Sequence, residues 1–341
     1  MSTENKISEY FETAEKCWEA GQYEEAFKWY RLAAEQGDAV AQKKLGNCYF
    51  DGDGVEQNYA EAAKYFRLAA EQGYLVAQYN LGICYENGWG VEEDSEEAAK
   101  WYSEAARQGD SKAQNNLAVC YFNGEGVEQD YEEAAKWCRK AAEQGNIDAQ
   151  YNLGYFYEYG KGVEQDYEEA VKWFYKVAKN VHADAQFTLG VIYSREKNYD
   201  EAIKWYRRAA NQGHVKSQFN LGCIYGGEGE ELNYEEAVKW LRMAAEQGYS
   251  GAQNNLGTCY FGGEGVEQDY GEAVKWFKKA AEQEQANAQY NLGLCYEKGF
   301  GVEQDYKEAV KFYILAAKQD YWQAQNNLGL CYEKGLGVVQ D

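Results

Sequence analysis

The sequence predicts an all-α solenoid, a stack of about nine helix-turn-helix repeats followed by a final unpaired helix. The segment 77–85 recurs with variations at 113–121 and 149–157, and again from Ala252, Ala288 and Ala324. A fixed period of this length is typical of small helical units that stack on one another. Proline is absent, and because proline interrupts helix interiors, its absence suits a chain that is helical almost throughout.

The unit 77–112 shows how each repeat is built. Ala77, Leu81 and Cys84 lie at i, i+4 and i+7, which predicts one apolar stripe of a short helix, called helix A here. A loop with two glycines follows at 87–91. A second helix, helix B, is predicted over 96–107 and ends at Gly109, a residue type typical of helix C-termini. Each helix can bury its stripe only against its neighbours.

Large and small residues recur in fixed places of helix B. Pairs of alanines permit close approach of the helices, and a tryptophan series in register with them is expected to fill the core. The series is Trp101, Trp137, Trp173, Trp205, Trp240 and Trp276.

Six of the nine cysteines occupy one position of helix A. Equivalent positions in neighbouring repeats should lie about 10 Å apart, beyond the ~7 Å Cα separation that a disulfide allows. We therefore expect buried free thiols and no metal site. The six are Cys48, Cys84, Cys120, Cys259, Cys295 and Cys331.

The net charge of −23 argues against nucleic acid and anionic membrane surfaces as partners, because binding phosphate needs clustered Lys and Arg. No apolar run approaches the ~18 residues of a membrane span. Residues 1–9 lack the basic and apolar regions of a signal peptide, so a cytoplasmic location is expected. The glycine loops follow helices and lack a phosphate-loop pattern, so no cofactor is predicted.

The consensus reads Ala-x-x-x-Leu-Gly-x-x-Tyr, then Gly-x-Gly-Val, then Ala-x-x-Trp-aromatic-x-x-Ala-Ala-x-x-Gly. This pattern resembles the Sel-one-like repeat (SLR) family, a longer-looped relative of the tetratricopeptide repeat, over nearly the whole chain. The resemblance implies a right-handed α/α superhelix and a role as adaptor or scaffold in protein complexes. Some secreted relatives carry a disulfide in each repeat, whereas this chain has mostly one cysteine per repeat.

The repeats suggest one solenoid domain, 1–341, with four segments. Residues 1–37 resemble a tetratricopeptide unit, 38–182 and 250–341 hold regular repeats with the last one truncated, and 183–249 holds irregular short repeats. The irregular segment lacks the usual glycine loop between Ser194 and Tyr199. His182 and His214 occupy matching positions beside this break, either as incidental surface residues or as a pH-sensitive pair or metal half-site.

By analogy with tetratricopeptide units, helix A lines the concave face of the superhelix, and two of its positions are candidates for binding a peptide or protein segment. The position before Leu-Gly offers amides that could bind a peptide backbone, or could instead set the spacing of the repeats. It holds Asn80, Asn116, Asn152, Asn220, Asn255, Asn291 and Asn327. The preceding position offers aromatic binding anchors. It holds Tyr79, Tyr151, Phe187, Phe219 and Tyr290.

The sequence therefore predicts a non-enzymatic scaffold whose partner is a protein or peptide. One alternative is a hydrolase, because some SLR relatives are linked to β-lactam or cell-wall chemistry. Its only support here is Ser194 three residues before Lys197, without the companion motifs of a penicillin-binding site. A second alternative is a self-assembling structural protein, because the final helix A has no helix B to cover Leu328, Leu330 and Tyr332.

Overall fold

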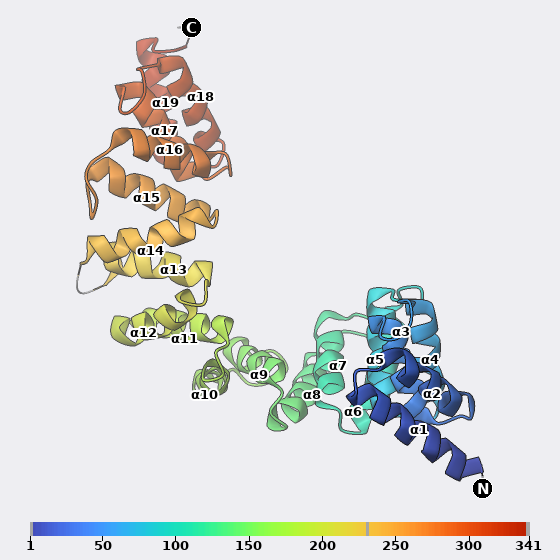
Figure 1. The fold of residues 1–341 in the computed structure, drawn as a ribbon. Coiled ribbons are helices and arrows are strands. Elements are labelled where there is room, and N and C mark those ends of the chain that lie inside the picture. Colours follow the sequence, from blue (N-terminus) through green and yellow to red (C-terminus); the bar gives the residue numbers. More distant parts are fainter. Residues whose placement is uncertain (1–2, 230–231, 339–341) are drawn as a thin grey trace. The chain divides into compact units, whose positions relative to one another are not determined.

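The computed structural model describes residues 3–229 and 232–338, and within them every regular element is helical. Nineteen α-helices and one short π-helical turn, η1, follow one another (Figure 1). Their bounds are α1 Thr3–Glu19, α2 Tyr23–Glu35, α3 Ala39–Asp51, α4 Tyr59–Glu71, α5 Leu75–Asn87, α6 Ser95–Arg107, α7 Ser111–Asn123, α8 Tyr131–Glu143, α9 Ile147–Tyr159, α10 Tyr167–Ala178, α11 Ala183–Arg195, α12 Tyr199–Ala210, α13 Val215–Cys223, η1 Ile224–Glu228, α14 Tyr234–Glu246, α15 Ser250–Gly262, α16 Tyr270–Ala281, α17 Ala286–Lys298, α18 Tyr306–Ala317 and α19 Trp322–Lys334.

Odd-numbered helices from α3 to α19 are the predicted A helices, and the even-numbered helices are the B helices. Nine pairs and the final single helix α19 are present in the described residues, which confirms the predicted all-α solenoid. Consecutive helices pack on one another from α1 to α9 and from α11 to α19. The chain forms two compact units, Met1–Val177 and Ala178–Asp341. The assignment of 1–341 to one domain, with its inner boundaries, stays a prediction.

Most B helices begin at a side-chain cap followed by acidic residues, as in α6. Asp94 Oδ1 accepts hydrogen bonds from the backbone N–H groups of Glu96 and Glu97 at 3.0 Å, which satisfies donors that the first turn leaves free. The two carboxylates also lie at the positive end of the helix dipole. Glu97 additionally pairs with Lys100 at 2.7 Å. Much of the chain's negative charge is thus placed where it stabilises helix starts.

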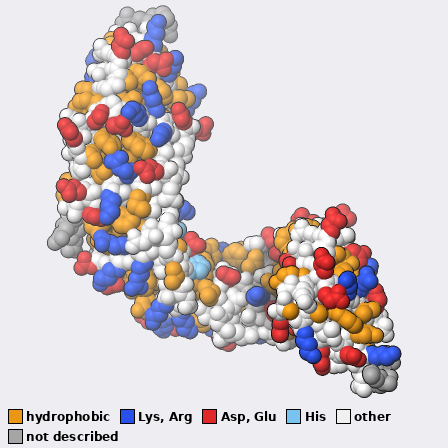
Figure 2. Space-filling model, viewed as in Figure 1, with side chains coloured by type: hydrophobic (Ala, Val, Ile, Leu, Met, Phe, Trp, Pro, Cys, Tyr) orange, Lys and Arg blue, Asp and Glu red, His pale blue; other side chains and the backbone are white. Residues whose placement is uncertain are grey.

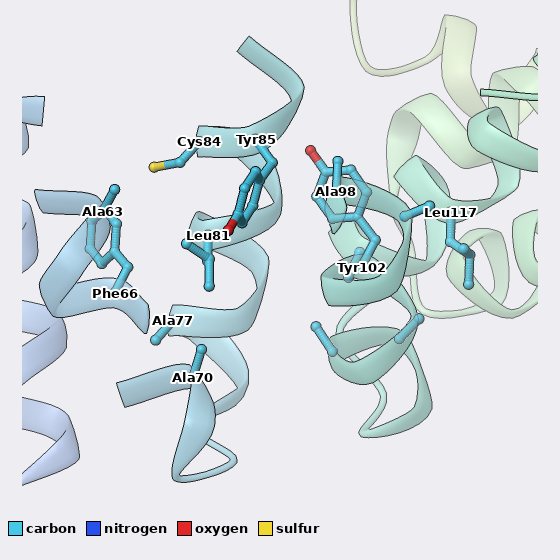
Figure 3. Packing of buried hydrophobic residues seen from close by; sticks show 14 of the residues in the cluster. Ala63, Phe66, Ala70, Ala77, Leu81, Cys84, Tyr85, Ala98, Tyr102 and Leu117 are labelled. Atoms are coloured by element: carbon cyan, nitrogen blue, oxygen red, sulfur yellow. The ribbon is translucent and has the colours of Figure 1, made fainter. Parts of the chain in front are cut away.

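In most repeats, a glycine of helix A packs against a large aromatic ring of helix B. Gly82 of α5 faces Tyr102 of α6, and a Cβ built on this glycine would lie 2.6 Å from the ring. The absence of a side chain lets the two helices pack closely. Figure 3 shows Leu81 and Tyr85 of α5 between Phe66 of α4 and the Tyr102 ring, with Leu117 beyond it.

The fully buried aromatic is the residue after the predicted tryptophan. Tyr102, Phe174, Tyr206 and Phe277 are 0–2% exposed. Trp205, Trp240 and Trp276 are buried as predicted, whereas Trp101, Trp137 and Trp173 are only partly buried. The reason is geometric: neighbouring helix residues point about 100° apart, and the residue after the tryptophan is the one that points at the glycine of helix A.

The second loop glycine permits a close contact between successive repeats. Gly90 has φ +73°, and a Cβ on it would lie 2.0 Å from the carbonyl oxygen of Tyr59 at the start of α4. Only glycine fits there, both for its positive φ and for lack of space. The loop of one repeat therefore packs on the first turn of helix B in the preceding repeat.

No disulfide joins any of the nine cysteines, all of which lie in described residues, and the six that share one position of helix A are buried. Burial raises the pKa of the Cys84 and Cys295 thiols to about 12. This confirms the prediction that the six are small core residues, because a buried protonated thiol is unreactive and packs as an apolar group.

Candidate functional site

The five aromatic candidates lie on A helices, and each is half-buried. Each ring contacts another aromatic ring. The centroid distances are 6.0 Å for Tyr79–Tyr102, 5.5 Å for Tyr151–Phe174, 5.9 Å for Phe187–Tyr206, 5.0 Å for Phe219–Tyr249 and 5.9 Å for Tyr290–Tyr313. One side of each ring is thus packed while part of the ring faces solvent. Tyr79 and Tyr151 belong to the first unit, and Phe187, Phe219 and Tyr290 to the second.

The asparagine candidates are half-buried, and most bond to a neighbouring helix. Asn152 donates to Asn115 Oδ1 at 3.1 Å, and Asn291 donates to Asn254 Oδ1 at 3.0 Å. These bonds link successive A helices. Further bonds join Asn80 to Asn47, Asn255 to Cys223 and Asn327 to Tyr313. Setting the repeat spacing is therefore one role of this row, and each bonded amide retains further donor or acceptor capacity.

A buried glutamine directly before the aromatic position was not singled out from the sequence. In the repeat 111–146, Gln114 is 4% exposed. Its Nε2 donates to the carbonyl of Ala106 at 3.1 Å, and its Oε1 accepts from Gln144 at 2.7 Å. The same pair of bonds recurs around Gln42, Gln78, Gln186, Gln218, Gln253 and Gln289. Its recurrence with the period of the repeat was the signal that could have revealed it.

The Tyr79 groove, defined here as the cavity lined by Tyr79, Ser111, Lys112, Asn115, Asn116 and residues 144–148, has a volume of about 490 Å³. It includes two of the predicted site residues, Tyr79 and Asn116. Its walls come from three successive A helices, α5, α7 and α9, together with the turn before α9. A second cavity, of about 330 Å³, includes the candidate Asn255. Figure 2 shows acidic, basic and hydrophobic side chains interspersed over one face of the chain.

The two histidines are helix caps. His182 Nδ1 accepts from the N–H of Ala185, and His214 Nδ1 accepts from the N–H of Ser217, both at 3.2 Å. The other nitrogen of His214 lies 3.4 Å from Asp184 Oδ1, and its ring lies 4.8 Å from that of Phe187. Burial lowers the pKa of His214, with Asp184 acting in the opposite direction and Lys216 in the same one. An accepting Nδ1 must be unprotonated.

In the described residues, no group of three or more His, Cys, Asp and Glu side chains is placed to hold a metal ion. Ser194, the candidate nucleophile of the hydrolase alternative, has its Oγ 3.5 Å from the Tyr206 hydroxyl. None of the helices described here is both long and apolar enough for a membrane span.

Comparison with protein-family models matches the Sel1 repeat to most of the chain. The matched residues are 20–38, 39–74, 75–110, 111–146, 147–182, 215–249, 250–284, 286–321 and 322–341. A tetratricopeptide repeat model matches 183–212, the repeat that lacks the glycine loop. No curated protein matches the sequence.

Among the solved structures that are similar to this chain, two match most of its length. One is a protective antigen present in uropathogenic Escherichia coli strains that displays an SLR fold: it is 40% identical, has a TM-score of 0.85, and the match covers 94% of this chain and 69% of the antigen. The other is a Sel1 repeat protein from Oxalobacter formigenes, which is 33% identical with a TM-score of 0.70, and the match covers 89% of this chain and 90% of that protein.

Proposed function

The chain belongs to the Sel1 repeat family, and from that premise we propose that it is a non-enzymatic scaffold that binds an extended segment of a partner protein along its A helices. Sel1 and tetratricopeptide repeat proteins generally serve as protein-interaction scaffolds. A helical repeat presents one equivalent surface position every 36 residues or so, which suits a ligand that is itself extended.

The observation that carries this proposal is the state of the five aromatic rings. Each is half-buried and held from one side by another ring. A ring that is already fixed loses little conformational freedom on binding, so more of its contact energy remains as affinity. Partly exposed, positioned aromatics are the residue type that dominates binding energy at protein interfaces.

The asparagine row supports the same surface. Four of its amides directly follow an aromatic candidate on the same A helix, namely Asn80, Asn152, Asn220 and Asn291. After bonding across to a neighbouring helix, an amide such as that of Asn152 still has a carbonyl oxygen and one N–H for a ligand. The rings would supply binding energy, and the amides would fix the register of the partner backbone.

Two alternatives have weaker support. The hydrolase alternative rests on Ser194 and Lys197, and the Ser194 hydroxyl faces Tyr206. Self-association through α19 rests on its exposed Trp322, Tyr332 and Leu330, which are 68%, 50% and 41% exposed. We also propose a reducing, cytoplasmic compartment, supported by nine cysteines that form no disulfide in the described residues.

The test is photo-crosslinking in lysate of the source cells. A benzoyl-phenylalanine replaces Phe219 in one bait and Leu68, a B-helix residue of 40% exposure, in a matched control. A partner crosslinked from Phe219, and lost when Phe187 is also changed to alanine, supports the A-helix surface. Equal crosslinking from both positions, with each variant folded by circular dichroism, refutes it. Sedimentation at several concentrations separates self-association.

A further inference from the structure

The Tyr79 groove differs in charge from the equivalent surface of other repeats. Two acidic residues stand at the starts of the two A helices that come after α5, the helix of Tyr79. Asp110 is the N-cap of α7, and Asp148 is in the first turn of α9. For Phe219, the two equivalent positions hold Tyr249 and Asn287. Among the five aromatic candidates, only Tyr79 has acidic residues at both of these positions.

The structure places these charges within electrostatic reach of the ring. Burial, then the carboxylates of Asp110, Glu86 and Asp148, raises the pKa of the Tyr79 phenol. Asp110 is held in place because its Oδ1 accepts from the N–H of Ala113 at 2.7 Å. The ring of Tyr79 is held by its contact with Tyr102. The lining of the groove contains one carboxylate, Asp148, and one cation, Lys112. The carboxylates of Asp110 and Glu86, outside the lining, add negative charge near the Tyr79 ring.

We propose that the Tyr79 groove binds an arginine or lysine side chain of the partner peptide, with the cation against the Tyr79 ring and its charge balanced by Asp148 and Asp110. This inference rests on the proposed scaffold function and specifies its ligand. An aromatic face attracts a cation electrostatically, and nearby carboxylates add charge-assisted hydrogen bonds. The amides of Asn115 and Asn116 line the same cavity and bond the adjoining peptide backbone.

The charge of the whole chain favours the same ligand. A net charge of −23 attracts a basic segment over distances of about 10 Å at moderate ionic strength and speeds its association. The net charge attracts any basic segment, whereas the Tyr79 groove recognises one basic side chain of that segment. Binding should weaken with added salt, as expected for a contact between charges that stay partly solvated.

The experiment is selection of random peptides displayed on phage against the intact chain and three variants. Tyr79→Leu removes the ring face and keeps an apolar side chain. Asp148→Asn removes one exposed carboxylate. Glu71→Gln makes the same charge change on α4, outside the groove, and is the matched control.

The expected result is a basic residue enriched at one peptide position by wild type and by Glu71→Gln, and lost with Tyr79→Leu and Asp148→Asn. For a selected peptide, replacing that arginine by the neutral isostere citrulline should weaken binding about tenfold, within the range for a partly desolvated cation–π contact. Circular dichroism confirms that each variant is folded.

Two other outcomes overturn the inference in different ways. Peptides selected without a basic preference, or with one that all variants keep, refute the groove while the scaffold function stands. No peptide enriched by any of the four proteins counts against the scaffold function as well, and the groove proposal falls with it.

Discussion

Replacing Gly82 by alanine measures how closely helix A and helix B of one repeat are packed. The new Cβ would lie 2.6 Å from Cε1 and 2.7 Å from Cδ1 of Tyr102. The ring is fully buried, and its hydroxyl donates to Glu86 at 2.7 Å. The ring therefore has little freedom to move away.

Two opposing effects set the magnitude. Alanine is better than glycine in a helix interior by about 1 kcal/mol, whereas overpacking a core costs about 1–3 kcal/mol. The steric effect should win, for a net loss of about 1 kcal/mol. Gly329 occupies the same position in α19, where nothing lies within 4 Å of an added Cβ. Gly329→Ala should therefore stabilise α19 by up to about 1 kcal/mol.

The chain already contains a compensated version of this pair. In the repeat 111–146, Ala118 stands at the position of Gly82 and Cys138 at that of Tyr102, both buried. In a Tyr102→Cys background, Gly82→Ala should accordingly become stabilising. The reversal of sign is the signature of direct steric coupling.

The assay is amide hydrogen exchange by mass spectrometry, because solenoids open locally and a single unfolding free energy is poorly defined for them. Peptides from α5 and α6 should exchange faster in Gly82→Ala than in wild type. The same peptides should exchange more slowly in the double variant Gly82→Ala/Tyr102→Cys than in Tyr102→Cys alone. Equal effects of Gly82→Ala and Gly329→Ala, or no sign reversal, would refute the packing argument.

Three further results are expected. Gln114→Leu should destabilise its repeat by about 2 kcal/mol, because two hydrogen bonds worth about 1 kcal/mol each are lost; exchange in α6 to α8 measures it. His214→Asn, which keeps a capping oxygen, should remove a pH dependence of local stability. Burial lowers the pKa of folded His214 below its ordinary 6.5, so the unfolded chain binds more protons and stability falls as pH drops below about 6.5; melting between pH 5 and 8 shows it. Under native conditions iodoacetamide should modify Cys17 and Cys223, the two half-buried thiols, ahead of the seven buried ones.

For each of these three predictions, one experimental result would contradict the reasoning. An unchanged exchange rate around position 114 would mean that leucine packing offsets both hydrogen bonds. Identical pH profiles for wild type and His214→Asn would show that the cap of α13 does not titrate in that window. Uniform alkylation of all nine cysteines would contradict the burial of the thiols, and peptide mapping after mild labelling distinguishes these cases.

The repeating pattern was enough to predict the helices, their pairing and the unpaired α19. The period of apolar residues, the loop glycines and the absence of proline act locally, so each can be read from one repeat. Free thiols at the six shared cysteine positions were also predictable from the repeat. Equivalent positions on stacked helices lie too far apart for two thiols to form a disulfide. The aromatic and asparagine positions were also visible, because they stand beside the Leu-Gly pair in every unit.

Which residues meet across helices was decided only by the tertiary structure. The sequence placed the tryptophans in the core, yet Tyr102 and its equivalents point at the glycine, because a rotation of about 100° between neighbours selects one of two adjacent rings. Gln114 and Gln144 are 30 residues apart and meet only after α7 and α8 pack. Likewise, Tyr79 is on α5, Asp110 is the N-cap of α7 and Asp148 is on α9. The two carboxylates act on the Tyr79 ring only because these three helices are stacked.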